Sequence, residues 1–338
     1  FRHTYCFLNR SAHICDDLTE KIDWEYASEG GLWLDNLHYM RFWDTLDLHL
    51  SEQDEANLLA WLQSWEQAVE NKYESKAFNP PYNASERAFS LGRFLLCRGP
   101  LTNCQLDALI KRIIARDLNF VASRLEFHLG GNHLLKNLMA LAWGSCLFEG
   151  KDVLRWKKIL DKEFHDEPEK QILADGFHYE RSPMYHNIAL LDLLDVINIS
   201  RAGPFRDSLE AIAKRMCSAT RLATHADGKI VFFNDCALDS YPCSSDIINY
   251  SDLICGQTKK PEALPDAGIF ALNAGEDLEI LAKVGPIGAD EQMGHAHSDL
   301  LSFEMSVNGH MFLVNSGTSS YCDQPFRDYE RATRAHNT

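Results

Sequence analysis

The residues best suited to chemistry lie late in the sequence, in the segment 294–299 (GHAHSD). His295 and His297 are two positions apart, and residues at i and i+2 of an extended segment project to the same side. Two imidazoles on one side can share a metal ion, or one can transfer a proton while the other holds an ion or a substrate. A pair of surface histidines in a loop would give the same pattern, so the choice depends on segments upstream.

A second polar cluster occupies residues 175–186 (DGFHYERSPMYH), just before the most apolar helical segment of the chain. Tyr185 is the candidate for proton transfer, and Arg181 could hold a carboxylate or orient Glu180. Placing these polar groups in front of a buried helix is costly unless they face a cleft. An ion pair beside a packed tyrosine is the structural alternative.

Two further segments could hold an anion. Asn132 and His133 follow two glycines at the expected start of a helix, where unpaired N–H groups and the helix dipole favour negative charge. Asn132 could equally be a simple N-cap. The segment 331–338 (RATRAHNT) carries Arg334 and His336, and it would be either a solvated basic surface or an anion contact.

Helices must position the candidate residues that lie in the first 220 residues of the chain. Ser51 and Asp54 form a possible capping box before a run with helical spacing, and the prolines at 80 and 81 predict a loop. Apolar residues at helical spacing predict helices at 58–69, 85–96, 102–114, 135–148, 153–164, 188–199 and 209–219. No strand-like alternation is evident in the first 220 residues, so we expect a helical domain at 1–225 with short loops between antiparallel helices.

The pattern changes after residue 225. Short strands are expected at 229–233, 269–272, 278–284, 301–307 and 311–314. Asn308-Gly309 is a strong signal for a type I′ hairpin turn between the last two. The sequence therefore predicts an α+β chain whose second domain, at 226–338, is an antiparallel sheet region that stops abruptly and is expected to be incomplete.

Composition excludes several classes of protein. The chain has 338 residues, 45% of them apolar, and a formal charge of -16, which argues against nucleic acid as the main partner. An acidic polysaccharide is not excluded, because a local basic cleft can lie on an acidic protein. None of the ten cysteines forms a C-x-x-C pair, no run of about 18 apolar residues predicts a membrane span, and no signal-peptide pattern is present. Oligomeric state stays open.

Several motifs, in order along nearly the whole chain, resemble those of the heparinase II/III-like polysaccharide lyases. The matching segments are 131–133 (GNH), 180–186 (ERSPMYH), 285–288 (GPIG), 294–299 (GHAHSD), 301–304 (LSFE), 315–318 (NSGT) and 335–338 (AHNT). The resemblance implies an N-terminal (α/α) toroid followed by a C-terminal antiparallel β-sandwich region, truncated in this chain. It also implies β-elimination on a uronate-containing polysaccharide, and a substrate of that class favours a periplasmic or extracellular location.

The resemblance assigns roles to individual residues. Asn132 and His133 match the positions that neutralise the uronate carboxylate, and Tyr185 and His295 match the proton-transfer positions. Which of the latter two is the base depends on the stereochemistry of the substrate. Substrate contacts are expected from Tyr82, Arg87, Glu180, Arg181 and Arg334.

Some relatives carry a structural zinc ion beside this site. His297 and His336 fall where imidazole ligands would be, and Asn315 takes the place of a carboxylate ligand. Because an amide oxygen is a weak zinc ligand, zinc is an open expectation, and a hydrogen-bonded histidine pair is the alternative.

The reading favoured by these observations is a lyase acting on an acidic polysaccharide or oligosaccharide. Its rival is a non-catalytic glycan-binding protein that serves surface-polysaccharide assembly. A glycoside hydrolase would need two opposed carboxylates, and Glu180 has no convincing partner in the sequence.

Overall fold

The computed structural model describes residues 3–15, 21–46, 49–164, 166–237, 242–273, 277–319, 321 and 324–338. The chain forms two compact units, of which the first comprises residues 1–129 and 136–160 and the second residues 130–135 and 161–338. This division differs from the predicted boundary at 225/226, because the predicted helical region runs through both units. Among the described residues, no helix is long and apolar enough to span a membrane.

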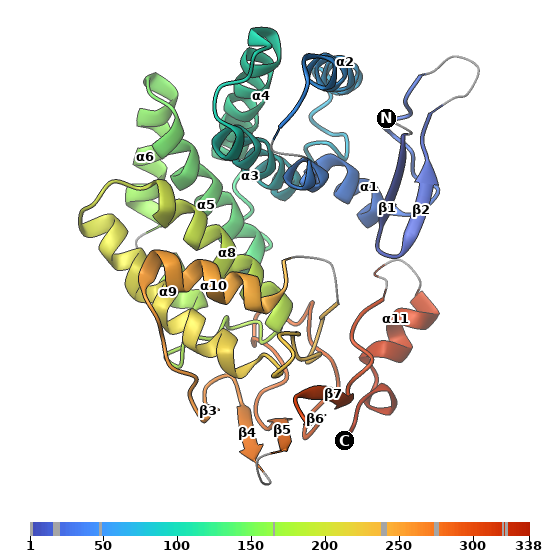
Figure 1. The fold of residues 1–338 in the computed structure, drawn as a ribbon, viewed down its shortest axis with the longest axis vertical. Helices are drawn as coiled ribbons and strands as arrows, with labels where there is room; N and C mark the ends of the chain where they lie inside the picture. Colours follow the sequence, from blue (N-terminus) through green and yellow to red (C-terminus); the bar gives the residue numbers. More distant parts are fainter. Residues whose placement is uncertain are drawn as a thin grey trace. The chain divides into compact units, whose positions relative to one another are not determined.

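The first unit is mainly helical (Figure 1). Its elements are β1 Thr4–Phe7, β2 Arg10–His13, α1 Gly31–Tyr39, η1 Arg41–Thr45, α2 Glu52–Val69, α3 Pro81–Arg98, α4 Cys104–Ser123, most of α5 Gly131–Leu147 and most of α6 Lys151–Glu163. The predicted capping box is confirmed, since the Ser51 side chain and the Asp54 side chain each bind the other residue's backbone N–H. The β1–β2 hairpin was not expected, because its turn places Leu8 and Asn9, rather than a glycine, at positive φ.

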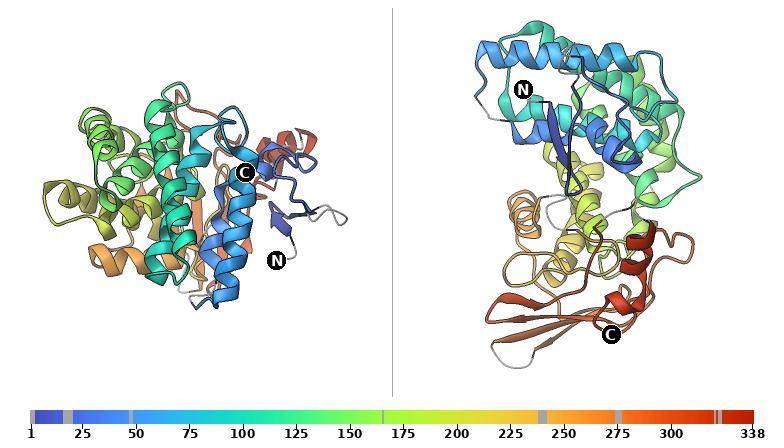
Figure 2. Two further views of the ribbon diagram at one scale, coloured as in Figure 1. Left: turned by 90° about the horizontal axis from the view of Figure 1, so that it is seen from above. Right: turned by 90° about the vertical axis from the view of Figure 1, so that its right-hand side faces the viewer.

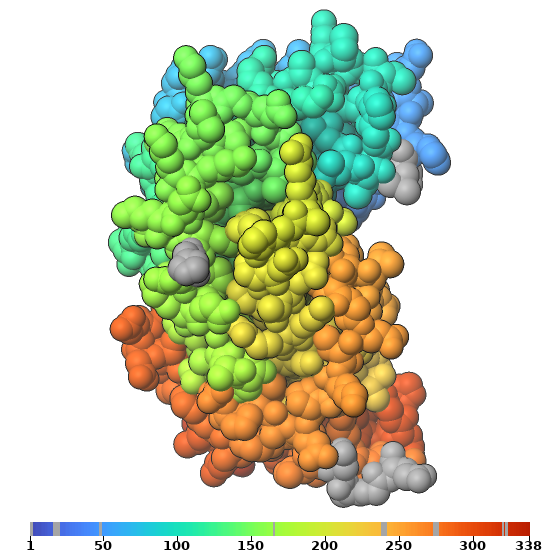
Figure 3. Space-filling view, turned by 90° about the vertical axis from the view of Figure 1, so that its left-hand side faces the viewer, coloured from blue at the N-terminus to red at the C-terminus, as the bar shows by residue number. Residues whose placement is uncertain are grey.

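The second unit combines helices with a sheet. Its elements are α7 Glu167–Gln171, α8 Pro183–Ile199, α9 Pro204–Leu222, α10 Ser244–Cys255, β3 Ala263–Leu264, β4 Ile269–Asn273, β5 Leu278–Lys283, β6 Phe303–Val307, β7 His310–Leu313, α11 Gln324–Arg331 and η2 Thr333–Ala335. Helices α8, α9 and α10 contact one another, and the surfaces of α9 (yellow) and α10 (orange) adjoin in Figure 3. Neither α10 nor α11 was predicted.

The five strands form one antiparallel meander in the order β3-β4-β5-β6-β7. In the right-hand view of Figure 2 the strands run side by side below α9. The predicted turn is confirmed, because Asn308 and Gly309 both have positive φ, at 51° and 78°. A core of apolar side chains joins the end of α9 to the sheet, and includes Leu222, Val231 and Leu281.

One predicted strand is wrong. Residues 229–233 make a single bridge, from Ile230 to Thr224, and enter no ladder. The N–H of Phe232 donates instead to the carboxylate of Glu304, and that of Val231 to the carbonyl of Ala223. Buried backbone groups must be paired, and here a side chain and a helix end pair them in place of a strand.

Strand β6 buries its polar face. Glu304 and Ser306 are buried, while Phe303, Met305 and Val307 are half-exposed, the reverse of a simple apolar-inward pattern. The Glu304 carboxylate accepts hydrogen bonds from His225 Nε2 at 2.8 Å and from the Phe232 and Asn315 N–H groups at 3.0 and 2.9 Å. Three partners of this kind offset the cost of burying the charge.

Candidate functional site

The start of α5 places Asn132 against Glu180. The Asn132 N–H donates to Glu180 Oε1 at 2.8 Å, so this chain's own carboxylate occupies the helix N-terminus. Gly131, with a φ of 51°, is required here, because a Cβ at this position would collide with that same carboxylate oxygen. The sequence allowed two roles for Asn132, an N-cap or a contact to an external anion. Asn132 is not the cap, because α5 already begins at Gly131. Its N–H binds Glu180 and is therefore not available to an external anion.

The second oxygen of Glu180 binds His295. His295 Nδ1 and Glu180 Oε2 are hydrogen-bonded, and Glu180 is 1% exposed. The backbone carbonyl of His295 accepts a hydrogen bond from the Asp235 N–H at 3.1 Å, and this bond holds the loop that carries His295. With Nδ1 bound to a carboxylate, the ring orientation is fixed and Nε2 is left for other chemistry.

Tyr185 lies directly on His295. It stands in the first turn of α8, where the Ser182 side chain accepts its N–H at 3.2 Å. The phenol and imidazole rings stack with centroids 3.7 Å apart and planes at 16°. Pro183 begins α8 five residues earlier than the apolar periodicity predicted, because proline suits the first helical position. Asn132, Glu180, His295 and Tyr185 therefore form one contiguous cluster.

The protonation of this cluster follows from burial and charge. Burial, followed by the nearby carboxylate of Asp235, raises the pKa of Tyr185 far above its ordinary value. Burial would raise the pKa of Glu180 as well, but the hydrogen bonds from His295 and from the Asn132 N–H contribute to lowering it overall. The cluster therefore holds a protonated phenol and an ionised carboxylate on either side of one imidazole.

Three further predicted residues of the same compact unit have different environments. His133 is half-buried in the first turn of α5, directly after Asn132. Arg181 is a structural brace rather than a free cation, because its guanidinium donates to the carbonyls of Tyr179, Gly288 and Asp266. These bonds use three of the five N–H donors of the guanidinium, so the predicted substrate contact stays a prediction. Arg334 is exposed and lies over the Tyr329 ring, and its predicted role stays a prediction.

Tyr82 and Arg87 belong to the first unit, and both are buried in α3. Arg87 donates to Asp117 at 2.7 Å and to two backbone carbonyls, and both side chains of the pair are fully buried. Arg87 as a substrate contact is therefore wrong. Tyr82 is 5% exposed and packs edge-on against Tyr39. Residues 81–83 of the loop predicted at 79–83 are in fact the first turn of α3, and Tyr82 in this turn is buried.

The two histidines predicted to hold zinc lie side by side, and zinc stays a prediction. His297 Nδ1 and His336 Nε2 are 3.2 Å apart and share a hydrogen bond, and the other nitrogens bind Asp235 and the Ala332 carbonyl. Asn315 Oδ1 accepts the Asn337 N–H at 2.9 Å. The outer nitrogens of both rings bind acceptors, as those of metal-bound histidines do, whereas within the described ranges no three His, Cys, Asp or Glu side chains are grouped to hold a metal ion.

Sequence reasoning missed the buried charges behind the site. One carboxylate oxygen of Asp235 lies 2.7 Å from His297 Nε2, and the other accepts a hydrogen bond from Arg327 at 2.7 Å. Lys283 Nζ lies 2.6 Å from Asp299 Oδ1, and both are buried. His297 and Asp299 belong to the segment 294–299, but their partners Asp235 and Lys283 lie in other segments, so no local motif could have predicted these pairs.

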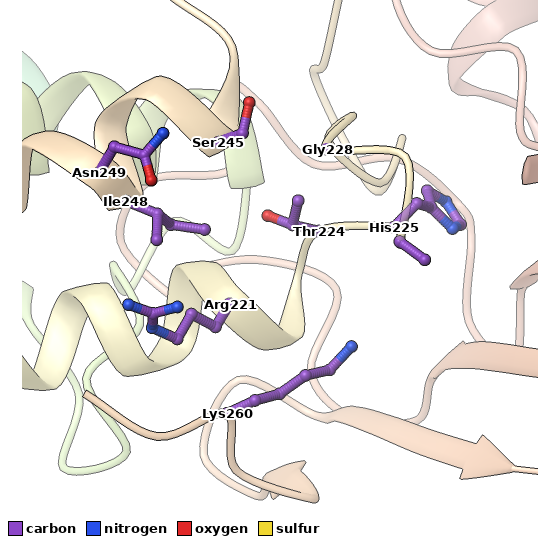
Figure 4. A pocket seen from close by; sticks show the side chains of 9 residues that line it. Arg221, Thr224, His225, Gly228, Ser245, Ile248, Asn249 and Lys260 are labelled. Atoms are coloured by element: carbon purple, nitrogen blue, oxygen red, sulfur yellow. The ribbon is translucent and has the colours of Figure 1, made fainter. Parts of the chain in front are cut away.

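A separate cavity of about 310 Å³ lies between α9, α10 and the turn at 224–228 (Figure 4). Its two cations, Arg221 and Lys260, already pair with Asp252 and Glu279, each at 2.5 Å. Neither Tyr185 nor any other member of the contiguous cluster lines it. The cavity is therefore not the candidate site.

Comparisons with known proteins agree on one family. The profile described as "Heparinase II/III N-terminus" matches residues 3–247, and that described as "Heparinase II/III-like, C-terminal" matches residues 256–338. A heparin-sulfate lyase of Pedobacter heparinus is 26% identical over 242 residues, which cover 62% of this chain and 35% of that protein. One from Bacteroides stercoris is 24% identical over 251 residues, with the same two coverages of 62% and 35%.

The fold agrees with the same family. A crystal structure of heparinase III superposes with a TM-score of 0.72 at 18% identity, over 97% of this chain and 57% of that one. The similarity establishes the fold, a helical toroid followed by an antiparallel sheet region, as predicted. The chain spans about a third of the length of the two curated lyases it matches, by the 35% coverage of each.

Proposed function

The chain belongs to the heparinase II/III-like family, and we propose that it is a polysaccharide lyase that cleaves a uronate-containing polysaccharide by β-elimination. The observation that carries the proposal is the contiguous cluster, in which Glu180 binds both Asn132 and His295 while Tyr185 stacks on His295. The two heparin-sulfate lyases among the relatives support a glycosaminoglycan as the substrate class.

The first requirement of this reaction is to make the C5 proton of the uronate acidic. A charged carboxylate next to C5 opposes loss of that proton, and donors that neutralise it stabilise the enolate-like transition state. We assign this task to the side chains of Asn132 and His133, which lie in the first turn of α5. The backbone of Asn132 is already held by Glu180, so its amide side chain is positioned before the substrate arrives.

The second requirement is a base and an acid. His295 Nε2 takes the C5 proton, the electron pair of the C5–H bond forms the C4–C5 double bond, and the C4–O4 bond breaks. Tyr185 donates its proton to O4, a role that suits a phenol whose pKa is raised. Glu180 stabilises the imidazolium that forms, because its ionised carboxylate binds Nδ1. Every step uses side chains of this chain.

The test is an ultraviolet assay for unsaturated uronate ends on a panel of acidic polysaccharides. Tyr185→Phe and His295→Ala should each lower kcat by a factor on the order of 10² to 10⁴. Tyr250→Phe is the matched control, because Tyr250 is a half-buried phenol that binds Asp195 and lies outside the cluster. Full activity in Tyr185→Phe would contradict the proposal, and binding of the panel without any product would favour the glycan-binding alternative.

A further inference from the structure

A second phenol lies beside Tyr185. The hydroxyl oxygens of Tyr185 and Tyr321 are 3.3 Å apart, although the two residues are 136 positions apart in the sequence. Tyr321 is half-buried, and burial, together with Tyr185 and Asp235, raises its pKa well above the ordinary value. No sequence motif pointed to this residue. Its hydroxyl therefore remains protonated and within hydrogen-bond reach of the group proposed to act as the acid.

Buried charges fix the position of Tyr321. The Arg327 guanidinium lies over its ring, 4.6 Å from the centroid. Arg327 in turn binds both oxygens of Asp235, one of them at 2.7 Å, and Asp235 has no exposed surface. The Thr318 hydroxyl also donates to Asp235, at 3.0 Å. A guanidinium held in this way cannot move freely, so the ring it covers is held as well.

The direction of the phenol–phenol hydrogen bond decides what Tyr321 can do. Tyr185 has one proton, and a proton directed at Tyr321 would not be available to the sugar. We propose that Tyr321 is a positioning residue for Tyr185: its hydroxyl donates to the Tyr185 oxygen, which leaves the Tyr185 proton directed at O4 of the substrate. This inference rests on the proposed lyase function.

The same bond acts during the transfer. As the Tyr185 O–H bond breaks and the O4–H bond forms, negative charge develops on the Tyr185 oxygen. The carboxylates of Asp235 and Glu180 oppose that charge, whereas Arg327 and the hydrogen bond from Tyr321 stabilise it. Tyr321 keeps its own proton throughout. Donors aimed at the atom where charge develops lower the barrier more than they tighten ground-state binding.

The experiment compares two substrates in wild type and Tyr321→Phe. On the natural polymer, Tyr321→Phe should lower kcat roughly 10- to 100-fold with little change in KM, the range for losing a hydrogen bond to a developing charge. On a uronate that carries nitrophenolate at C4, the leaving group needs no proton, and the variant should match wild type. Tyr250→Phe is the control, and it should equal wild type on both substrates.

Each of the other outcomes contradicts the inference about Tyr321 or the proposed function. An equal loss of kcat on both substrates would show a general structural effect of Tyr321 and overturn the inference. Unchanged kcat on the polymer would overturn it too. A wild-type protein that cleaves neither substrate would overturn the proposed function and the inference with it. Thermal unfolding of the variant, compared with wild type, identifies a loss caused by misfolding, and that loss would affect both substrates alike.

Discussion

Glu180 is the residue on which the geometry of the site depends. Its two oxygens bind Asn132 and His295, which approach from segments 48 and 115 positions away. The sequence indicated Glu180 as a substrate contact and as a carboxylate that Arg181 could orient. The left-handed backbone at Arg181, with a φ of 57°, turns the two side chains to different partners. A residue type was predictable here, whereas its role required the three-dimensional contacts.

Gly131 and Gly130 give a matched test of that role. Both have positive φ, so replacing either with alanine should cost a similar backbone strain, about 1 kcal/mol. A Cβ at Gly131 would displace the Glu180 carboxylate, whereas one at Gly130 meets nothing within 4 Å. We expect Gly131→Ala to lower kcat at least about 10-fold relative to Gly130→Ala, measured by the ultraviolet assay. Equal activities at equal stability would argue against Glu180 as the organising residue.

At the scale of elements, α8 begins in a set of buried histidines. His186 accepts the His178 N–H at Nδ1, and its ring stacks on Phe177 with centroids 4.4 Å apart. Burial, followed by the charge of His178, lowers the pKa of His186 to about 3. Burial lowers the pKa of His178 to about 4. The folded unit therefore keeps both rings neutral at pH values where the unfolded chain would be charged.

His186 should make stability depend on pH. Its folded pKa of about 3 lies below the unfolded value of 6.5, so below pH 6.5 the unfolded chain binds more protons and stability falls as pH falls toward 3. Between pH 7 and 5 this residue should contribute a loss of about 2 kcal/mol. Urea unfolding at both pH values should show a smaller loss in His186→Asn than in wild type, and the exposed control His310→Asn should match wild type. Equal losses in all three would count against the assignment.

The elements also show which features the sequence could predict. Periodicity located helices and strands because it depends on neighbours within a few residues, and Asn308-Gly309 defined a turn through its own backbone preferences. The same local rules failed at β6, where Glu304 turns inward because its partners come from His225, Phe232 and Asn315. They also failed for 229–233, whose backbone partners are not strands. Long-range polar partners override a local pattern.

At the scale of the whole molecule, the chain is acidic and its proposed substrate is also acidic. The formal charge is -16, and several arginines are unavailable to a polyanion because they are buried in pairs, such as Arg87 with Asp117 and Arg327 with Asp235. At long range the electrostatic force between the chain and a polyanion is therefore weak or repulsive. Recognition must then depend on groups close to the site. This balance could be predicted from composition, whereas the pairing of each cation could not.

Ionic strength should reveal that balance. Between about 10 and about 150 mM NaCl the Debye length falls from about 30 to about 8 Å, so repulsion between the acidic chain and the polymer is screened. We expect kcat/KM on a uronate polysaccharide to rise over this range, and to stay flat on the same polymer after its carboxylates are methylated to neutral esters. A fall in kcat/KM with added salt would mean that a local basic surface steers the substrate despite the net charge. The neutral polymer separates this effect from any influence of salt on the protein itself, because only the charged substrate responds to screening.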